Sequence, residues 1–559
     1  MSWLYLMVRR VDVESPGPAW LLFTLNSLLR TSPHHIYSLL LVFPPSVLLL
    51  HTEGEEDFEA EDFRVAYSAL AALARTFIRQ PVAADFARFK LYAARVQTLD
   101  NQFSLHIPCP RTPIDNAVWK VLSENGPVPL LPNLRHLFYN EGPRRLLHSK
   151  NPSGEPYFYP AKVLLGPSLL HVDVNLEGRE QPQGIIARLT KLSSKLTFLS
   201  LVNQALRPMD LPDLPGCITG CHLPNLADIT EWNTAQTMIS PQFLVHLASQ
   251  PNLRYLEFKT ERRLWRDRNV FPSERRSTLF PALKALYVHF DELEWCVAFL
   301  NVIASPVLET VKLTLDRDAT MGPIDNDLLR ALCTALKHHP SRPHIREVGI
   351  RLGSTNGFKG CLYGGLDSEP DIFGPETITP LVQLESVTNL TVLGWCDIYL
   401  DDHFFKRAIG HWSQLEHLEL YCGSPRKMSF SSSCLSSVTL ASLAILAGSC
   451  PRLRVLSLLI DAKEVPLDDP TDPMRYCVDP EKSSLTTLVV GSSPLKDPVK
   501  VASFLSRIFP KLECLRNDGH DRACARLWTQ TNRLLREFKL IRCQERSWVN
   551  TRQLHRACQ

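Results

Sequence analysis

One eight-residue pattern recurs through most of this 559-residue chain and constrains its fold more than any other feature. It reads Pro or Ser, any residue, Leu, two variable residues, Leu, one variable residue and an apolar residue, as in PNLRYLEF at Pro251–Phe258. Because apolar and variable positions alternate in its second half, each copy predicts a short strand with one buried face. We find thirteen copies: Pro132–Tyr139, Pro167–Val174, Ser194–Leu201, Pro224–Glu231, Pro251–Phe258, Pro281–Val288, Pro306–Leu313, Pro343–Ile350, Thr388–Trp395, Ser413–Leu420, Pro451–Leu458, Ser483–Val490 and Pro510–Asn517.

A helix is expected between successive copies, which lie about 25 to 45 residues apart, longer than regular leucine-rich repeats. Nine of the thirteen copies begin with Pro, which ends a preceding helix and opens a strand. The pattern therefore predicts an α/β leucine-rich-repeat solenoid, with a curved parallel sheet inside and helices outside. The Gly-containing stretch 352–380 is expected to be a loop. Apolar spacing typical of helices occurs at Gln242–Ala248, Leu293–Ile303, Asp327–His338, Asp402–Gly410, Leu440–Ala447 and Val499–Phe509.

The variable positions within each strand are predicted to face outward on the concave side of the sheet. They mix aromatic, basic and acidic residues, a composition that suits a protein partner. The competing interpretation, stronger for any single residue, is an ordinary solvated strand side chain. His136 and Phe138 also occupy such positions. We call the following eleven predicted partner-binding residues the concave strip: Tyr255, Glu257, Lys259, Tyr287, His289, Lys312, Glu347, Arg351, His417, Glu419 and Tyr421.

Composition excludes several function classes. A net charge of +3 gives no electrostatic case for nucleic acid. The 15 cysteines are scattered, which favours a reducing compartment, cytoplasm or nucleus. The apolar stretches near the N-terminus are shorter than a membrane span, so no membrane association is expected. We expect no metal or cofactor and no enzyme, because no phosphate-binding loop, nucleophile elbow or zinc motif occurs. Asp401 and Asp402 are read as helix caps.

The segment before the repeats divides into two parts. Residues 1–62 are apolar and then acidic, and the acidic run is most simply a solvated linker. Residues 63–110 are predicted to be mainly helical up to Leu99, and Ala84–Val96 places Phe86, Phe89 and Ala93 on one helix face. The solenoid is predicted over 111–545 and a tail over 546–559.

Leu70–Leu99 carries a family resemblance. Its end reads F-x-x-Y-A-x-x-V-x-x-L, with Phe89 as the first residue and Leu99 as the last. With the repeats that follow, it resembles the F-box leucine-rich-repeat proteins of mushroom-forming fungi. No Leu-Pro-x-Glu start precedes Leu70, so the F-box is degenerate or truncated.

This resemblance implies a substrate-recognition subunit of a Skp–cullin–F-box ubiquitin ligase. The Skp-type adaptor would contact Leu70, Leu73 and Phe77, and the target protein would bind the concave face. Two alternatives are a non-degradative repeat scaffold that has lost adaptor binding, and an enzyme whose site lies in 352–380 or in the Cys-containing C-terminal region.

Overall fold

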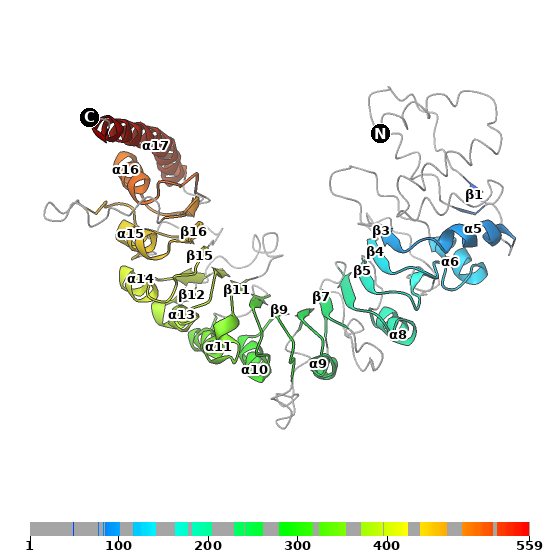
Figure 1. Ribbon diagram of the computed structural model, residues 1–559. Helices are drawn as coiled ribbons and strands as arrows, with labels where there is room; N and C mark the ends of the chain where they lie inside the picture. Colours follow the sequence, from blue (N-terminus) through cyan, green and yellow to red (C-terminus); the bar gives the residue numbers. More distant parts are fainter. Residues whose placement is uncertain are drawn as a thin grey trace, which may run out of the picture. The chain divides into compact units, whose positions relative to one another are not determined.

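The computed structural model describes residues 48–49, 76–77, 82, 84–100, 116–140, 163–176, 182–203, 229–239, 241–260, 279–316, 324–353, 371–394, 396–422, 437–466, 483–517 and 522–557. The chain divides into two compact units, Met1–Leu253 and Arg254–Gln559, which we call unit 1 and unit 2. In each unit, parallel strands form one layer and helices form a second layer on one face of the strands (Figure 1). The predicted α/β leucine-rich-repeat solenoid is confirmed.

Unit 1 contains five parallel strands in sequence order and, in the part described, four helices of eight residues or more. Before them, β1 (Leu48–Leu49) and β2 (Thr76–Phe77) form an antiparallel pair. The parallel strands are β3 (Thr98–Asp100), β4 (His136–Asn140), β5 (His171–Leu176), β6 (Phe198–Asn203) and β7 (Glu231–Met238). The helices are α5 (Asp85–Ala93), α6 (Asn116–Asn125), α8 (Pro182–Leu192) and α9 (Pro241–Ala248).

Unit 2 continues the same arrangement over nine parallel strands. The strands are β8 (Tyr255–Lys259), β9 (Ala285–Phe290), β10 (Thr310–Leu315), β11 (Glu347–Leu352), β13 (Asn389–Gly394), β15 (His417–Cys422), β16 (Val455–Leu458), β17 (Thr487–Val489) and β18 (Cys514–Arg516). A separate parallel pair is formed by β12 (Asp371–Phe373) and β14 (Cys396–Ile398). The helical segments are α10 (Leu293–Val302), α11 (Asn326–His338), η4 (Arg342–His344), α13 (Pro375–Val382), α14 (Asp402–Ala408), α15 (Leu440–Ser449), α16 (Pro498–Ile508) and α17 (Arg522–Ala557).

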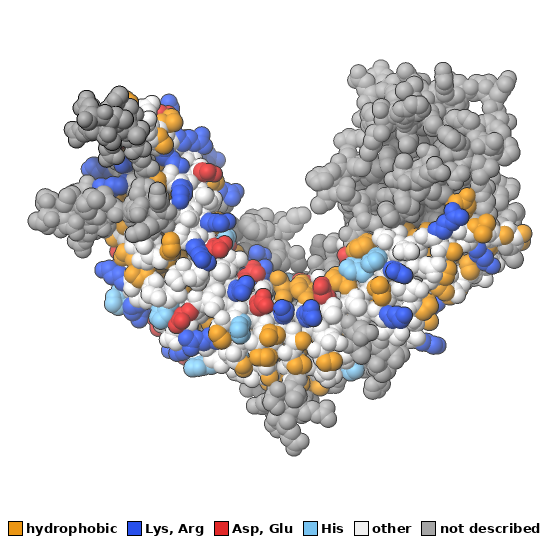
Figure 2. Space-filling model, viewed as in Figure 1, with side chains coloured by type: hydrophobic (Ala, Val, Ile, Leu, Met, Phe, Trp, Pro, Cys, Tyr) orange, Lys and Arg blue, Asp and Glu red, His pale blue; other side chains and the backbone are white. Residues whose placement is uncertain are grey.

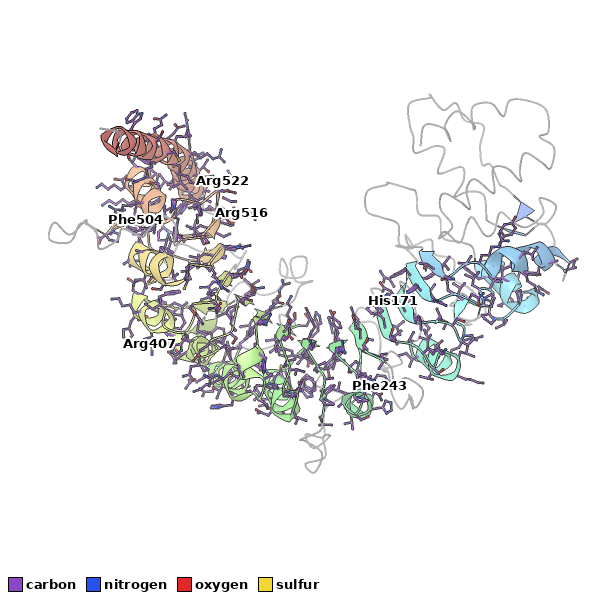
Figure 3. All side chains as sticks on the ribbon, viewed as in Figure 1. His171, Phe243, Arg407, Phe504, Arg516 and Arg522 are labelled. Carbon is purple, nitrogen blue, oxygen red and sulfur yellow. The ribbon has the colours of Figure 1, made fainter. Side chains whose placement is uncertain are left out.

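Three apolar positions of each repeat form the core. In the repeat of β8 these are Leu253, Leu256 and Phe258, all 0 % exposed. The helices supply the other side of the core. In unit 1, Phe243 of α9 (labelled in Figure 3) is buried, and its ring centroid lies 5.1 Å from that of Trp232. Burying an apolar side chain of this size contributes about 1.5 to 3 kcal/mol, so the core supplies most of the driving force for stacking.

One backbone contact repeats between neighbouring repeats. The carbonyl of Arg135 accepts hydrogen bonds from the N–H groups of Leu170 (2.8 Å) and His171 (3.0 Å) of the next repeat. In unit 2 the carbonyl of Arg254 accepts the N–H groups of Lys284 (2.8 Å) and Ala285 (2.9 Å) in the same way. This contact aligns the first buried position of each repeat with that of its neighbour.

Helix starts are capped as the sequence indicates. Asp401 accepts a hydrogen bond from the Phe404 N–H at 2.7 Å. Asp402 does not cap its own helix α14; it accepts from both the N–H and the hydroxyl of Thr439, the N-cap residue of α15, at 2.8 Å. Asp325 and Asp497 cap α11 and α16 similarly. These carboxylates satisfy N–H groups that a helix leaves unpaired.

Two repeat copies are shifted by three residues from the predicted register. The strand partner of Leu199 is Trp232, so the buried positions are Ile229, Trp232 and Thr234 instead of Leu226, Ile229 and Glu231. The predicted register was wrong because Trp232 and Thr234, which occupy the second and third buried positions, do not match the leucine consensus. Ile229 does match it, and so was assigned to the second position although it occupies the first.

The same correction applies to the copy predicted at Thr388–Trp395. Leu390 pairs with Val348, and the buried positions are Val387, Leu390 and Val392. Leu393, predicted to point inward, is partly exposed. The β-branched Val387 takes the first position, which the leucine consensus does not include.

The loop predicted at 352–380 is wrong in its last part, where α13 begins at Pro375. Ile378 and Leu381 of this helix are 2 % and 1 % exposed, so α13 is the helical half of an ordinary repeat. Pro380 inside it disguised the pattern, since proline removes a helical N–H.

The parallel sheet begins earlier than the predicted start of the solenoid at 111. Phe86, Phe89 and Ala93 of α5 are each 1 % exposed, as the helical spacing predicts. Leu99, however, lies on β3, which pairs in parallel with β4. Among the described residues, α5 and β3 are therefore the first helix–strand repeat of the array. At the other end, α17 runs through the predicted boundary at 545.

Three cysteine thiols are buried in the helix layer of unit 2: Cys296 on α10, Cys333 on α11 and Cys450 after α15. Burial raises their pKa values, to about 12 for Cys333 and Cys450. Within the described ranges, no helix combines the length and apolarity needed to cross a membrane. The same ranges contain no cluster of His, Cys, Asp or Glu side chains arranged to hold a metal ion.

Replacing Leu256 with Asp should destabilise unit 2, because an unpaired carboxylate would enter a fully buried site. We expect a loss on the order of 4 kcal/mol in unfolding free energy, measured by urea denaturation. The control Arg254→Asp, two residues away and exposed, should cost less than about 1 kcal/mol. Equal losses in the two variants would contradict the assigned strand register.

His339, the C-cap residue of α11, should make unit 2 acid-sensitive. It is 5 % exposed, its Nδ1 lies 2.6 Å from Ser341 Oγ, and burial lowers its pKa from 6.5 to about 4. A lowered histidine pKa gives stability that is complete above pH 6.5 and is lost as the pH falls towards 4, by about 3 kcal/mol in total.

Native-state hydrogen exchange of α11 amides tests this. His339→Gln should flatten the fall in opening free energy between about pH 7 and pH 4, since the titrating group is gone. The neighbouring His338 is exposed, so His338→Gln should leave the pH dependence unchanged. The same slope in wild type and His339→Gln would refute this role for the imidazole.

Candidate functional site

The concave strip of unit 2 is organised by strand register. On β8 to β11, the outward residues form rows across neighbouring strands: Glu257 lies beside Tyr287, and Tyr287 beside Lys312. A second row places Lys259 beside His289. Burial alternates along these strands as predicted, with the outward residues half-buried. The sheet therefore brings Tyr255, Glu257, Lys259, Tyr287, His289, Lys312 and Glu347 into one continuous surface.

Glu257 is at the centre of this surface. Its side chain is 16 % exposed, its Oε1 lies 3.8 Å from His289 Nε2, and its Oε2 accepts a hydrogen bond from the Tyr255 hydroxyl. Burial by itself raises the Glu257 pKa, but the nearby His289 ring and the hydrogen bond from Tyr255 outweigh it and hold the pKa below its ordinary value. The carboxylate is thus charged and fixed in position at neutral pH.

The two tyrosine rings and Lys312 complete the cluster. The ring centroids of Tyr255 and Tyr287 are 5.0 Å apart, and Lys312 Nζ lies 5.1 Å above the Tyr287 ring. Lys312 Nζ also forms an ion pair with Glu347 Oε1 at 2.8 Å. Partial burial lowers the Lys312 pKa, but the bond to Glu347 more than compensates and the pKa is raised.

Gly349 explains how Lys312 reaches Glu347. Gly349 is the strand neighbour of Lys312, in the outward row. A Cβ at this glycine would lie 3.3 Å from Lys312 Cγ, closer than an ordinary contact. The missing side chain leaves room for the lysine stem to lie along β11.

The other predicted residues lie at the edges of this cluster or beyond it. Lys259 Nζ pairs with Asp316 Oδ2 at 3.1 Å, and sequence reasoning missed Asp316 because it follows the last consensus position of β10. Arg351 is exposed on β11, one strand away from Leu393 of β13. On β15, His417 Nε2 lies 3.1 Å from Glu419 Oε1. That hydrogen bond, opposed by burial, lowers the pKa of Glu419.

β13 separates the His417–Glu419 pair from the Glu257 cluster, so the strip contains two groups. Tyr421 lies on β15 in register with Leu393.

Unit 1 has an aromatic cluster on its own strands that the predicted site did not include. His171 of β5, labelled in Figure 3, stacks on Phe198 of β6, with ring centroids 3.7 Å apart and planes 6° apart, as the ring geometry gives them. Phe138 lies 4.8 Å and His136 6.1 Å from the His171 ring. Partial burial lowers the pKa of His171. The signal was present, since His171 and Phe198 occupy the same repeat position as His136.

Of the predicted adaptor-binding residues, Leu70 and Leu73 lie outside the described residues. Phe77 is on β2 and is the antiparallel partner of Leu48. The helix predicted at Phe77 is therefore wrong. Residues 76–77 are extended because they pair with Leu48–Leu49 of the apolar N-terminal stretch. The local spacing of apolar residues does not contain this long-range pairing.

These features define the chain as an α/β leucine-rich-repeat solenoid with an outward aromatic and charged surface. A solved plant peptide hormone receptor, RGFR1 in complex with RGF2, is similar at 11 % identity and a TM-score of 0.30, over 73 % of this chain and 53 % of that one. The leucine-rich-repeat protein LegL7 of Legionella pneumophila is similar at 10 % identity and a TM-score of 0.27, over 65 % of this chain and 98 % of that one.

This chain thus spans about half the length of the plant receptor chain. No protein-family model matches the sequence. No curated protein matches it either.

Proposed function

We propose that this chain is a protein-binding repeat subunit whose concave strip in unit 2 contacts the partner. The observation that carries this proposal is the cluster around Glu257, where two tyrosine rings and paired charges lie on adjacent strands. Tyr is among the residues that most often dominate binding energy at protein interfaces. Side chains already held by neighbours lose little conformational entropy on binding, which favours affinity.

The cluster also indicates the chemistry of the partner surface. Glu257, Lys312 and Glu347 offer both signs of charge within one patch, and each charge has a partner in the unbound protein. A partner that buries this patch would need polar groups matching the pairs and apolar area over the rings. A folded protein surface or an extended peptide with mixed side chains has these features.

We further propose that the partner is a substrate for ubiquitination and that the chain is the receptor of a Skp–cullin–F-box ligase. The support is the resemblance of Leu70–Leu99 to the fungal F-box proteins, together with the repeat array that follows it. In this role the chain holds the target near a ubiquitin-conjugating enzyme and contributes proximity and orientation, with no chemistry of its own. The ligase would act in the cytoplasm or nucleus. A scaffold without adaptor binding is the alternative.

The triple variant Tyr255→Ala, Tyr287→Ala and His289→Ala should lose partner binding while keeping its fold. Removing hot-spot aromatic side chains weakens complexes by about tenfold or more. Proteins recovered from host lysate on immobilised wild-type and variant chains, quantified by mass spectrometry, provide the measurement.

A matched control changes three helix-layer residues, Glu294→Ala, Lys337→Ala and His338→Ala. It should recover the same partners as wild type. If the control and the triple variant recover equal amounts, the concave strip is not the binding surface.

Adaptor binding is tested separately, by pull-down of the full chain with the host Skp adaptor. The variant Leu73→Asp/Phe77→Asp should abolish the interaction, because the resemblance assigns the apolar contact to these residues. A folded wild-type chain that recovers no adaptor would refute the ligase role. It would leave the repeat scaffold, and partner binding on the concave strip would be unaffected by that result.

A further inference from the structure

Helix α17 has one side packed on unit 2. Trp528, Thr531 and Leu535 are 1 %, 0 % and 2 % exposed, and their spacing places them on one face of the helix. Trp528 Nε1 donates a hydrogen bond to the Ser493 carbonyl at 2.8 Å. The helix is therefore fixed to the last repeats along its first half.

Two basic residues extend this anchorage towards the middle of the helix. Lys539 Nζ donates to the Leu512 carbonyl, and Arg542 Nε donates to Ser506 Oγ of α16 at 3.0 Å. Beyond Arg542, the side chains of 543–545, 547 and 548 are all exposed. The described side chains after Arg542 are therefore accessible to solvent.

The opposite face of the first half is a row of arginines. Arg522, Arg526, Arg533 and Arg536 are each exposed, and at 3.6 residues per turn they project from the same side of the helix. None forms an ion pair with a residue in the described ranges. Figure 3 labels Arg522 at the start of the row, and Figure 2 shows Lys and Arg side chains gathered at this end of unit 2.

The exposed surface becomes more apolar in the second half of the helix, where Leu540 continues the arginine side and Ile541 and Trp548 lie about a quarter turn from it. Leu540, Ile541 and Trp548 are 60 %, 48 % and 66 % exposed. Ile541 and Trp548 are seven residues apart, the spacing by which one helix packs against another. From Arg522 to Trp548, two adjoining sides of the helix therefore present four arginines followed by three large apolar side chains, over about 39 Å.

The charge of α17 differs from that of the rest of the chain. The helix has nine Lys and Arg residues and two acidic residues, Glu537 and Glu545, a net charge of +7, whereas the whole chain has +3. Its first turn contains no acidic residue, although the helix dipole favours one there. Arg522 occupies that unfavourable first turn, and Arg526 follows directly after it. This arrangement costs stability in the unbound protein.

We propose that these two adjoining sides of α17 together dock an acidic amphipathic helix of another protein. Carboxylates of the partner would pair with the four arginines, and its apolar side chains would cover Leu540, Ile541 and Trp548. A second copy of this chain would bring two strongly basic helices together, which like-charge repulsion opposes. Nucleic acid would leave the apolar half uncovered. Glu537 and Glu545 beside the apolar side chains disfavour an anionic membrane.

The proposal is tested with the full chain and a labelled peptide that has Leu at heptad positions a and d and Glu at its exposed positions. Fluorescence anisotropy should show binding that weakens by about tenfold or more at about 1 M salt, where the Debye length is about 3 Å. Changing the four arginines to Gln should weaken it by about tenfold or more, as should Ile541→Ala/Trp548→Ala.

A charge-matched control changes Arg254, Arg346, Arg452 and Arg454, four exposed arginines outside α17, to Gln. This control and the concave-strip triple variant should both bind the peptide as wild type does. Equal weakening in the control, or equal binding of a peptide with Lys in place of Glu, would overturn the proposal. So would tighter binding of anionic vesicles or duplex DNA than of the acidic peptide, or concentration-dependent self-association of the wild-type chain by sedimentation.

Discussion

The repeated carbonyl contact between neighbouring repeats is the constraint on which the architecture depends. One oxygen accepts two N–H groups of the next repeat, as Arg254 does for Lys284 and Ala285. Each bond contributes only about 1 kcal/mol net, but both must be made because an unpaired buried N–H is costly. The contact therefore sets the register of every strand, and the register decides which side chains enter the core and which meet a partner.

The sequence predicted the strand register correctly in the repeats whose buried positions match the leucine consensus. Leu253, Leu256 and Phe258 fit the consensus, and their burial followed from alternation alone. Trp232 and Val387 occupy equivalent positions without fitting it, so their repeats were placed three residues away. The core accepts any apolar side chain of suitable volume, so a consensus written in terms of leucine does not find every buried position. Helix α13 was hidden for a similar reason, because proline obscured its apolar face.

Alternation also predicted which residues of the concave strip face outward, since that depends on single strands. It did not predict the partners. The arrangement around Glu257 needs a neighbouring strand to bring His289 within reach, and the path of Lys312 depends on a glycine one strand further on. Such contacts lie about 25 to 45 residues apart along the chain and follow only from the completed sheet. In unit 1, the shared repeat position of His171 and Phe198 can be read from the sequence, but their ring stacking depends on the neighbouring strand in the same way.

The buried cysteines have a consequence for how this array can be observed. Cys296, Cys333 and Cys450 each belong to a different repeat of unit 2, and thiolate, the reactive form, is suppressed at all three by burial. A thiol reagent can reach each one only when its own repeat opens. The three cysteines therefore act as separate probes of local unfolding in unit 2. Comparing their alkylation rates shows whether the repeats open from one end or in the middle.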